Sequence, residues 1–163
     1  MVRIDTATRV VDGPPTAVFA ALVDADARTA WLPPAGMTGR FDRFDARPGG
    51  GYRLVLTYDD STVRGKSGAN SDVADVRFVE IDPPGRVVEE TDFVSADPAF
   101  SGTMTLTWTV DPHPDGARVT VAAHDVPPGI SEADHVAGMT STLGNLDSYV
   151  RGQGCAPRAT FDP

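Results

Sequence analysis

Residues 131–150, SEADHVAGMTSTLGNLDSYV, decide the fold, because their apolar side chains repeat with the period of a helix. One face of this predicted helix, about five turns long, carries Val136, Met139, Leu143, Leu146 and Val150, at i, i+3, i+7, i+10 and i+14. Ser131, with Asp134 three residues later, resembles a capping box and predicts where the helix begins. A helix with one apolar stripe must bury that stripe against another part of the chain.

The chain before this helix is dominated by strand patterns. The clearest is residues 103–110, TMTLTWTV, in which large apolar residues alternate with threonine, as in a half-buried antiparallel strand. The predicted strands are residues 2–11, 39–46, 52–58, 73–81, 86–94, 103–110 and 117–124. Two short helices are predicted after the first strand, at residues 16–23 and from a cap at Asp24 to about Leu32.

Three segments have less regular patterns. Residues 59–72 are polar and contain Gly and Ser, which predicts a loop, and residues 152–163 read as a flexible tail. In residues 73–94 both faces carry apolar and charged groups, so the inward register stays open, because a slip of one residue reverses every side chain.

Composition narrows the class of protein. The chain has 163 residues, 40% of them hydrophobic, which suits a single globular domain. Its net charge of −9, with scattered Lys and Arg, disfavours binding to nucleic acid and to anionic membranes. Its single cysteine, Cys155, excludes an internal disulfide, and no apolar run is long enough to span a bilayer. We expect a cytoplasmic location.

These patterns predict an α+β fold. A curved antiparallel sheet of about seven strands wraps around the long C-terminal helix, and two short helices follow the first strand. The sheet's inner face is the large apolar surface available to the helix, so an apolar cavity is expected between them. We assign residues 1–151 to this domain and residues 152–163 to the tail.

Several local motifs occur along the chain in a definite order. They are Trp31-Leu32-Pro33, Arg47-Pro48-Gly49-Gly50-Gly51-Tyr52, Arg77-Phe78-Val79-Glu80 with Pro83-Pro84, Phe100-Ser101-Gly102-Thr103-Met104, and Val126-Pro127-Pro128-Gly129-Ile130 with Asp134-His135 and Gly138. Together with the order of elements, these motifs resemble the START-like, or polyketide cyclase/SRPBCC, superfamily, and within it the group named for the activator of the heat-shock protein 90 ATPase. The resemblance spans about residues 3–151 and rests on the order and spacing of these motifs together.

The resemblance implies a helix-grip fold with a deep cavity for hydrophobic small molecules. It does not imply a single activity, since members include binders, cyclases and co-chaperones. The sequence departs from many relatives at Met139, where they carry tryptophan after the glycine of the last helix. A slimmer and more flexible side chain there should change the shape of the cavity.

The expected cavity-lining residues come from the inner faces of the strands and of the long helix. They are Trp31, Phe41, Tyr52, Leu54, Leu56, Tyr58, Phe78, Met104, Leu106, Trp108, His135, Met139 and Leu143. Tyr52 and Tyr58 could orient a polar group of a ligand, and His135 borders the inward stripe, where it could act as a hydrogen-bonding group or a general acid or base. The alternative is that the tyrosines belong to the core and that His135 is exposed.

Other chemistry has weaker support. Glu89 and Glu90 are adjacent on a strand, so one of them should face inward, either as an acid in the cavity or paired with an arginine. Hydrolysis is disfavoured because Ser131 already fits as a helix cap and no nucleophile elbow is present. The histidines are too dispersed for a metal motif, so we expect neither a metal nor a cofactor.

Three functions therefore remain. The first is binding of a hydrophobic small molecule. The second is an enzyme, such as a cyclase or lyase acting on an aromatic or polyketide-like substrate, which requires two or more ionisable groups converging in the cavity. The third is a co-chaperone, which requires an exposed apolar patch. A homodimer and a chaperone partner both stay open.

Overall fold

The computed structural model describes residues 3–33, 36–58, 71–83, 85–93 and 96–160. The strands are β1 (Ile4–Val11), β2 (Met37–Asp45), β3 (Gly51–Tyr58), β4 (Ser71–Asp82), β5 (Arg86–Phe93), β6 (Gly102–His113) and β7 (Gly116–His124). The helices are α1 (Pro15–Val23), α2 (Ala25–Trp31) and α3 (Glu132–Thr160), with a 3₁₀ turn η1 at Pro98–Phe100. The loop predicted at residues 59–72 lies mostly outside the described residues, and Ser71 and Asp72 belong to β4.

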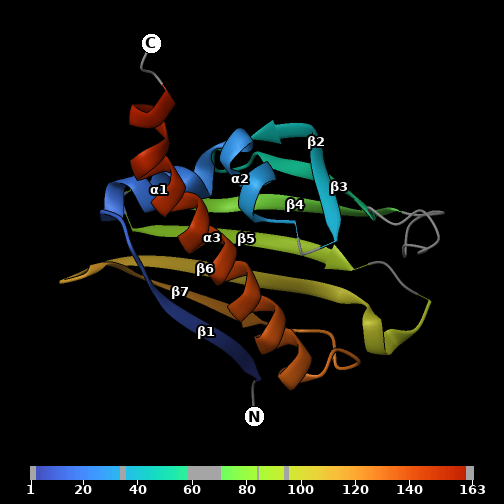
Figure 1. The fold of residues 1–163 in the computed structure, drawn as a ribbon. Helices are drawn as coiled ribbons and strands as arrows, with labels where there is room; N and C mark the ends of the chain where they lie inside the picture. The colour runs from blue at the N-terminus through green and yellow to red at the C-terminus, as the bar shows by residue number, and fades with distance from the viewer. Residues whose placement is uncertain (1–2, 34–35, 59–70, 84, 94–95, 161–163) are drawn as a thin grey trace.

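The strands form one antiparallel sheet in the order β1-β7-β6-β5-β4-β3-β2. Its curved face holds α3, which crosses the sheet diagonally, while α1 and α2 cover one end (Figure 1). The predicted helix-grip α+β fold is therefore confirmed, with seven strands.

Local signals place the helix starts where the sequence predicts them. The backbone N–H of Asp134 donates to Ser131 Oγ at 3.1 Å, and that of Ala27 donates to Asp24 Oδ2 at 2.8 Å. Both side chains accept from N–H groups that have no partner within the first turn of a helix. These caps explain why the chain turns into a helix at each point.

The end of α3 differs from the prediction. The helix continues to Thr160, so residues 152–160 are helical where a flexible tail was expected. The apolar stripe ends at Val150, and the sequence beyond it contains Gly152, Gly154 and Pro157, which are poor helix formers. The local sequence therefore does not require the helix to continue past its buried face.

The register that the sequence left open in residues 73–94 is settled by the core. Val76 and Phe78 of β4 are buried, as are Val87 and Glu89 of β5, and Val79 is exposed. The pairing of β4 with β5 shifts between Phe78 and Glu80. Such a bulge re-aims the side chains that follow it, which is why simple alternation fails in this segment.

Two polar clusters fix α3 on β1. Near its N-terminal end, His135 contacts Asp5, and three turns later Asp147 accepts hydrogen bonds from the Arg9 side chain and the Asp12 backbone N–H. The Asp12 N–H and Arg9, opposed by burial, lower the pKa of Asp147. These contacts hold α3 on the sheet at residues 135 and 147, close to the two ends of its buried stretch.

Candidate functional site

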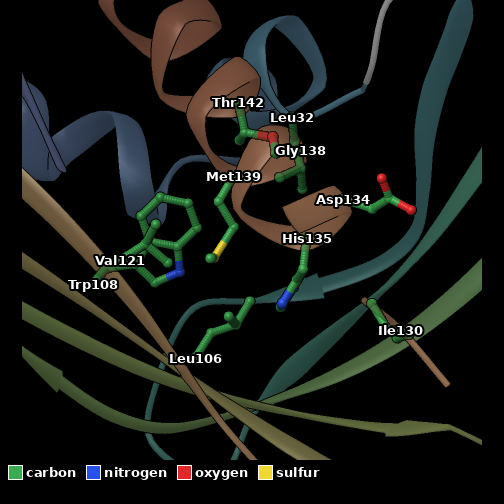
Figure 2. A pocket seen from close by; sticks show the side chains of 10 residues that line it. All are labelled: Leu32, Leu106, Trp108, Val121, Ile130, Asp134, His135, Gly138, Met139 and Thr142. Carbon is green, nitrogen blue, oxygen red and sulfur yellow. The ribbon is translucent and has the colours of Figure 1, made fainter. Parts of the chain in front are cut away.

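A cavity of about 400 Å³ lies between the N-terminal half of α3 and the sheet (Figure 2). Its lining residues are Leu32, Leu106, Trp108, Val121, Ile130, Asp134, His135, Gly138, Met139 and Thr142. Ligand sites usually have volumes of roughly 300–1,000 Å³ and mostly apolar walls. The cavity therefore has the size and chemistry of a small-molecule site.

The floor of the cavity comes from two neighbouring strands. Trp108 of β6 and Val121 of β7 are register partners, so their side chains lie side by side on the inner face. Both are buried, whereas Leu106, two residues before Trp108 on the same face, is only half-buried. The threonine alternation that predicted β6 thus also aims its large residues at the cavity.

The helix contributes a stripe that is offset from its core-packing face. His135, Gly138, Met139 and Thr142 lie at i, i+3, i+4 and i+7, and all line the cavity. Farther along, Leu143, Leu146 and Val150 are buried in the core. The helix therefore covers the cavity with residues 135–142 and closes the packed core with residues 143–150.

His135 is held in place by a buried carboxylate. Its Nδ1 lies 2.8 Å from Oδ2 of Asp5, a fully buried residue of β1, and Arg3 binds both oxygens of that carboxylate at 2.8 and 2.9 Å. The hydrogen bonds from Arg3 and then His135 lower the pKa of Asp5. Because an ionised carboxylate can only accept, Nδ1 carries the proton of this hydrogen bond, and Nε2 is the ring atom left to interact with a ligand.

The ring of His135 projects from α3 into the space above Leu106, whereas the carboxylate of Asp134 points away from it (Figure 2). Asp134 is exposed at the rim. Among the described lining residues, His135 is thus the ionisable side chain that faces the interior. The arrangement offers one hydrogen-bonding group of fixed orientation inside an apolar pocket.

Trp108 contributes a second polar atom. Its side chain is 3% exposed, and within the described residues its Nε1 has no hydrogen-bond partner. The other tryptophan, Trp31, packs edge-to-face against Trp108 with 5.6 Å between ring centroids, and its own Nε1 donates to the carbonyl of Ala21 at 3.0 Å. Within the described part of the chain, Trp31 is thus the indole whose N–H has a partner, and Trp108 is the one whose N–H has none.

A buried ion pair lies behind Trp108. Arg28 of α2 is 0% exposed and pairs with Glu89 of β5, which is 1% exposed. Arg28 also donates to the Leu22 carbonyl at 2.6 Å and to the Tyr52 hydroxyl at 3.1 Å. Burial, with the negative charge of Glu89, raises the pKa of the Tyr52 phenol. Four aromatic rings surround the guanidinium at 5.3–6.0 Å, those of Trp31, Tyr52, Phe78 and Trp108.

This pairing settles which of the two adjacent glutamates faces inward. Glu89 does so as the partner of an arginine, and it does not line the cavity as an acid. Glu90 lies on the other face and contacts Arg77 at 3.1 Å. The arginine alternative is therefore the correct one.

The structure brings together four of the thirteen residues expected at the cavity, namely Leu106, Trp108, His135 and Met139. The other nine do not line it. Eight of them lie in or against the core, namely Trp31, Phe41, Tyr52, Leu54, Leu56, Phe78, Met104 and Leu143, and Tyr58 is half-buried at the end of β3. Phe41 and Phe78, for example, belong to an aromatic cluster with Phe44 and Tyr52. These rings fill the part of the sheet under α2, where a larger cavity was expected.

Several site residues were not predicted. Val121 follows from the alternation of β7, and Gly138 from its helical spacing to His135, so patterns existed that could have identified both. Asp5 had no such signal, because its partner His135 lies 130 positions away in the sequence. Arg28 lies in a helix of seven residues, and no sequence pattern indicated that it would be buried beside the site.

Two other hollows, of about 410 and 460 Å³, lie around Tyr149 on the outer side of the helices. Their linings are largely small residues such as Ala20, Ala27, Ala30 and Ser148. Volume alone does not distinguish them from the cavity under α3. The cavity differs in having large apolar walls with inward polar atoms, so it is the better candidate.

Among the described residues, no group of three or more His, Cys, Asp or Glu side chains is placed to hold a metal ion. No helix in the described ranges is both long and apolar enough to cross a membrane.

A seven-stranded antiparallel sheet that grips a C-terminal helix over an apolar cavity defines the START-like class of helix-grip proteins. Within it, this chain belongs to the family of activator of Hsp90 ATPase homolog 1-like proteins, whose family model matches residues 12–151. A comparison with curated proteins found no match.

Solved structures agree with this assignment. A protein from Chromobacterium violaceum is 26% identical, with a TM-score of 0.77 over 90% of this chain and 96% of its own. An AHSA1-like protein from Aeromonas hydrophila is 19% identical, with a TM-score of 0.71 over 93% and 94% of the two chains. A protein from Arthrobacter aurescens, 15% identical, has a TM-score of 0.75 over 100% and 98%. The last two likenesses show the fold alone.

Proposed function

We propose that this chain binds an apolar small molecule in the cavity under the N-terminal half of α3. The observation that carries the proposal is the apolar cavity of about 400 Å³ into which His135, fixed by Asp5, projects. Water in such a cavity finds few polar partners, because most of the lining side chains are hydrocarbon. An apolar molecule that displaces this water gains the hydrophobic transfer free energy, about 25 cal/mol per Å² of buried apolar surface.

His135 gives the bound molecule an orientation. With its Nδ1–H donated to Asp5, the ring leaves Nε2 to form a hydrogen bond with a polar group of the ligand. The fixed ring loses little rotational freedom when the ligand binds, which favours affinity.

Catalysis ranks second, and one observation favours it. The contact between Asp5 and His135 is the geometry by which a carboxylate orients a general base. A cyclase or lyase, however, needs a second ionisable group in the cavity, and the Asp134 carboxylate points away (Figure 2). We therefore propose binding ahead of a chemical reaction.

A chaperone-directed role has less support from the surface. The exposed large apolar residues in the described ranges are Ile4, Val73, Val79 and Phe100, on β1, β4 and η1. β1 forms one edge of the sheet, and β4 is separated from it by three strands. Scattered apolar residues of this kind are normal on a soluble surface.

The proposal is tested by titrating the purified chain with the neutral fluorophore N-phenylnaphthylamine. Gly138 lines the cavity, and a Cβ added there meets open space, so Gly138→Leu places a side chain in the mouth. Gly144 is also open but lies outside the cavity on the same helix, so Gly144→Leu is the matched control. We expect saturable binding that weakens about tenfold or more in Gly138→Leu and is unchanged in Gly144→Leu.

Two results would contradict the proposal. One is the absence of saturable fluorescence enhancement for the natural chain. The other is an equal loss of affinity in the two leucine variants, which would place the fluorophore outside the cavity. Native mass spectrometry of the purified chain would show in addition whether a molecule from the expression host stays bound.

A further inference from the structure

Trp108 carries a buried hydrogen-bond donor that the described part of the chain leaves unused. Its Nε1 is closed off from solvent and has no hydrogen-bond partner among the residues that the structure describes. Buried polar atoms of side chains nearly always have a partner, so an exception calls for an explanation. Because Trp108 lines the cavity, the missing acceptor is best sought in what the cavity holds.

Trp31 provides an internal comparison. It is the same residue type, is fully buried, and its ring packs against that of Trp108, yet its N–H has the Ala21 carbonyl at 3.0 Å. The fold thus supplies an acceptor for one indole and leaves the other facing the space between helix and sheet. Figure 2 shows the Trp108 nitrogen on the edge of the ring toward Met139.

We propose that the ligand of this cavity carries an uncharged hydrogen-bond acceptor, such as the carbonyl of a ketone, ester or lactone, and accepts the Nε1–H of Trp108. This inference rests on the proposed function and names the chemical class of the ligand. Apart from this acceptor and the polar group that meets His135, the molecule is apolar, as the walls formed by Leu106, Val121 and Ile130 require.

The acceptor is neutral because the site offers no unpaired positive charge to an anion, since His135 already pairs with the carboxylate of Asp5. No lysine or arginine is among the lining residues of the described chain. Asp134 lies at the rim, and the ionised Asp5 lies behind His135. The nearby Arg28 already pairs with Glu89. A carboxylate ligand would lose its hydration without gaining a counter-ion, which is unfavourable.

Met139 controls access to the donor. The indole nitrogen has almost no exposed surface, and the thioether of Met139 lies on its side of the cavity (Figure 2). Methionine is unbranched and adapts its rotamer at little cost. A ligand carbonyl reaches Nε1 when this side chain moves aside, so we expect Met139 to change conformation on binding.

The test uses two ligand pairs that differ only by a carbonyl in place of a methylene group, fluorenone with fluorene and valerophenone with pentylbenzene. The readout is the pair of indole N–H resonances in a ¹⁵N-labelled protein, because the chain has two tryptophans. We expect the ketones to shift the Trp108 resonance downfield and the hydrocarbons not to. The Trp31 N–H keeps its bond to Ala21 and should move little with either.

Affinities supply the second readout. In each pair, the ratio of the hydrocarbon Kd to the ketone Kd measures the preference for the carbonyl. This ratio should fall about fivefold in Trp108→Phe, which removes the N–H, the fold-change expected for one neutral hydrogen bond. Using a ratio cancels the change in cavity size that the substitution also causes. If Trp108→Phe does not fold, the resonances of the natural chain decide the question.

The outcomes separate the two proposals. Binding of both members of a pair without a ketone-specific shift of the Trp108 N–H, or with an unchanged ratio in Trp108→Phe, overturns the inference and leaves the proposed function standing. Failure of both pairs to bind overturns the proposed function and the inference together.

Discussion

The buried ion pair between Arg28 and Glu89 gives the sharpest prediction about this structure. Both side chains are almost fully buried, and α2 and β5 that carry them meet directly behind Trp108. Replacing Arg28 by Met leaves the buried Glu89 carboxylate without a counter-ion. Replacing Glu89 by Gln leaves the buried Arg28 guanidinium without one. Neither charge is reachable by solvent, so neither can be stabilised by water.

The magnitude follows from the burial. Removing one partner of a buried pair typically costs about 3–5 kcal/mol. Arg28→Met should lie toward the upper end, because it also removes the hydrogen bonds to the Leu22 carbonyl and the Tyr52 hydroxyl. Glu89→Gln should lie toward the lower end, because those bonds and the surrounding rings remain. Such losses are a large part of the roughly 5–15 kcal/mol by which a domain is stable.

The assay is a double-mutant cycle measured by urea unfolding and circular dichroism. The double variant Arg28→Met, Glu89→Gln removes both charges, so its loss should fall short of the sum of the single losses by about 2–3 kcal/mol. The exposed pair of Arg53 and Asp75, 2.9 Å apart and about half exposed, is the control and should show a far smaller coupling. Additive losses at Arg28 and Glu89 would refute the reasoning.

Three further predictions concern the cavity and its supports. Asp5 has a lowered pKa, so its contribution to the free energy of unfolding is present above about pH 4 and is lost as the pH falls through the folded value. Asp5→Asn should therefore flatten the loss of stability below about pH 4, measured by urea unfolding, and an unchanged slope would contradict this. The pKa of Tyr52 is raised, so the stability contributed by its neutral phenol is present below about pH 10 and is lost as the pH rises further. In a spectrophotometric titration, Tyr52 should ionise only when the protein unfolds at alkaline pH. Tyr52→Phe should remove this part of the tyrosine ionisation signal. Gly138→Ala and Gly144→Ala each add a Cβ in open space within α3, so each should raise the free energy of unfolding by about 0.5–1 kcal/mol, and a loss in either would mean that its Cβ meets an obstacle.

Much of the fold is predictable from the sequence because its signals are local. The threonine alternation of residues 103–110 is the pattern of β6, and Ser131 and Asp24 are confirmed as helix caps. Each of these patterns involves residues within about one helical turn or one strand. It can therefore be recognised from a short segment, without information about the rest of the chain. The end of α3 is the exception, since nothing local requires a helix to continue past its buried face.

The candidate site is predictable only in part. His135 and Met139 follow from the helical period, and Leu106 and Trp108 from strand alternation, which shows that they share a face with the core. Alternation does not say whether an inward residue meets a cavity or another side chain. Tyr52 satisfies the same pattern as Leu106, yet it packs among Phe41, Phe44 and Phe78.

The sequence by itself determined a sheet of alternating strands closed by one amphipathic helix, because backbone hydrogen bonding and side-chain periodicity are properties of short segments. The tertiary structure alone decided which polar groups meet. It joins Asp5 to His135 across 130 positions and Arg28 to Glu89 across 61, and it leaves the N–H of Trp108 without a partner in the described chain. Such pairings depend on the curvature of the sheet and the placement of α3 and α2 on it, since a charge or a donor finds its partner through space and not along the chain.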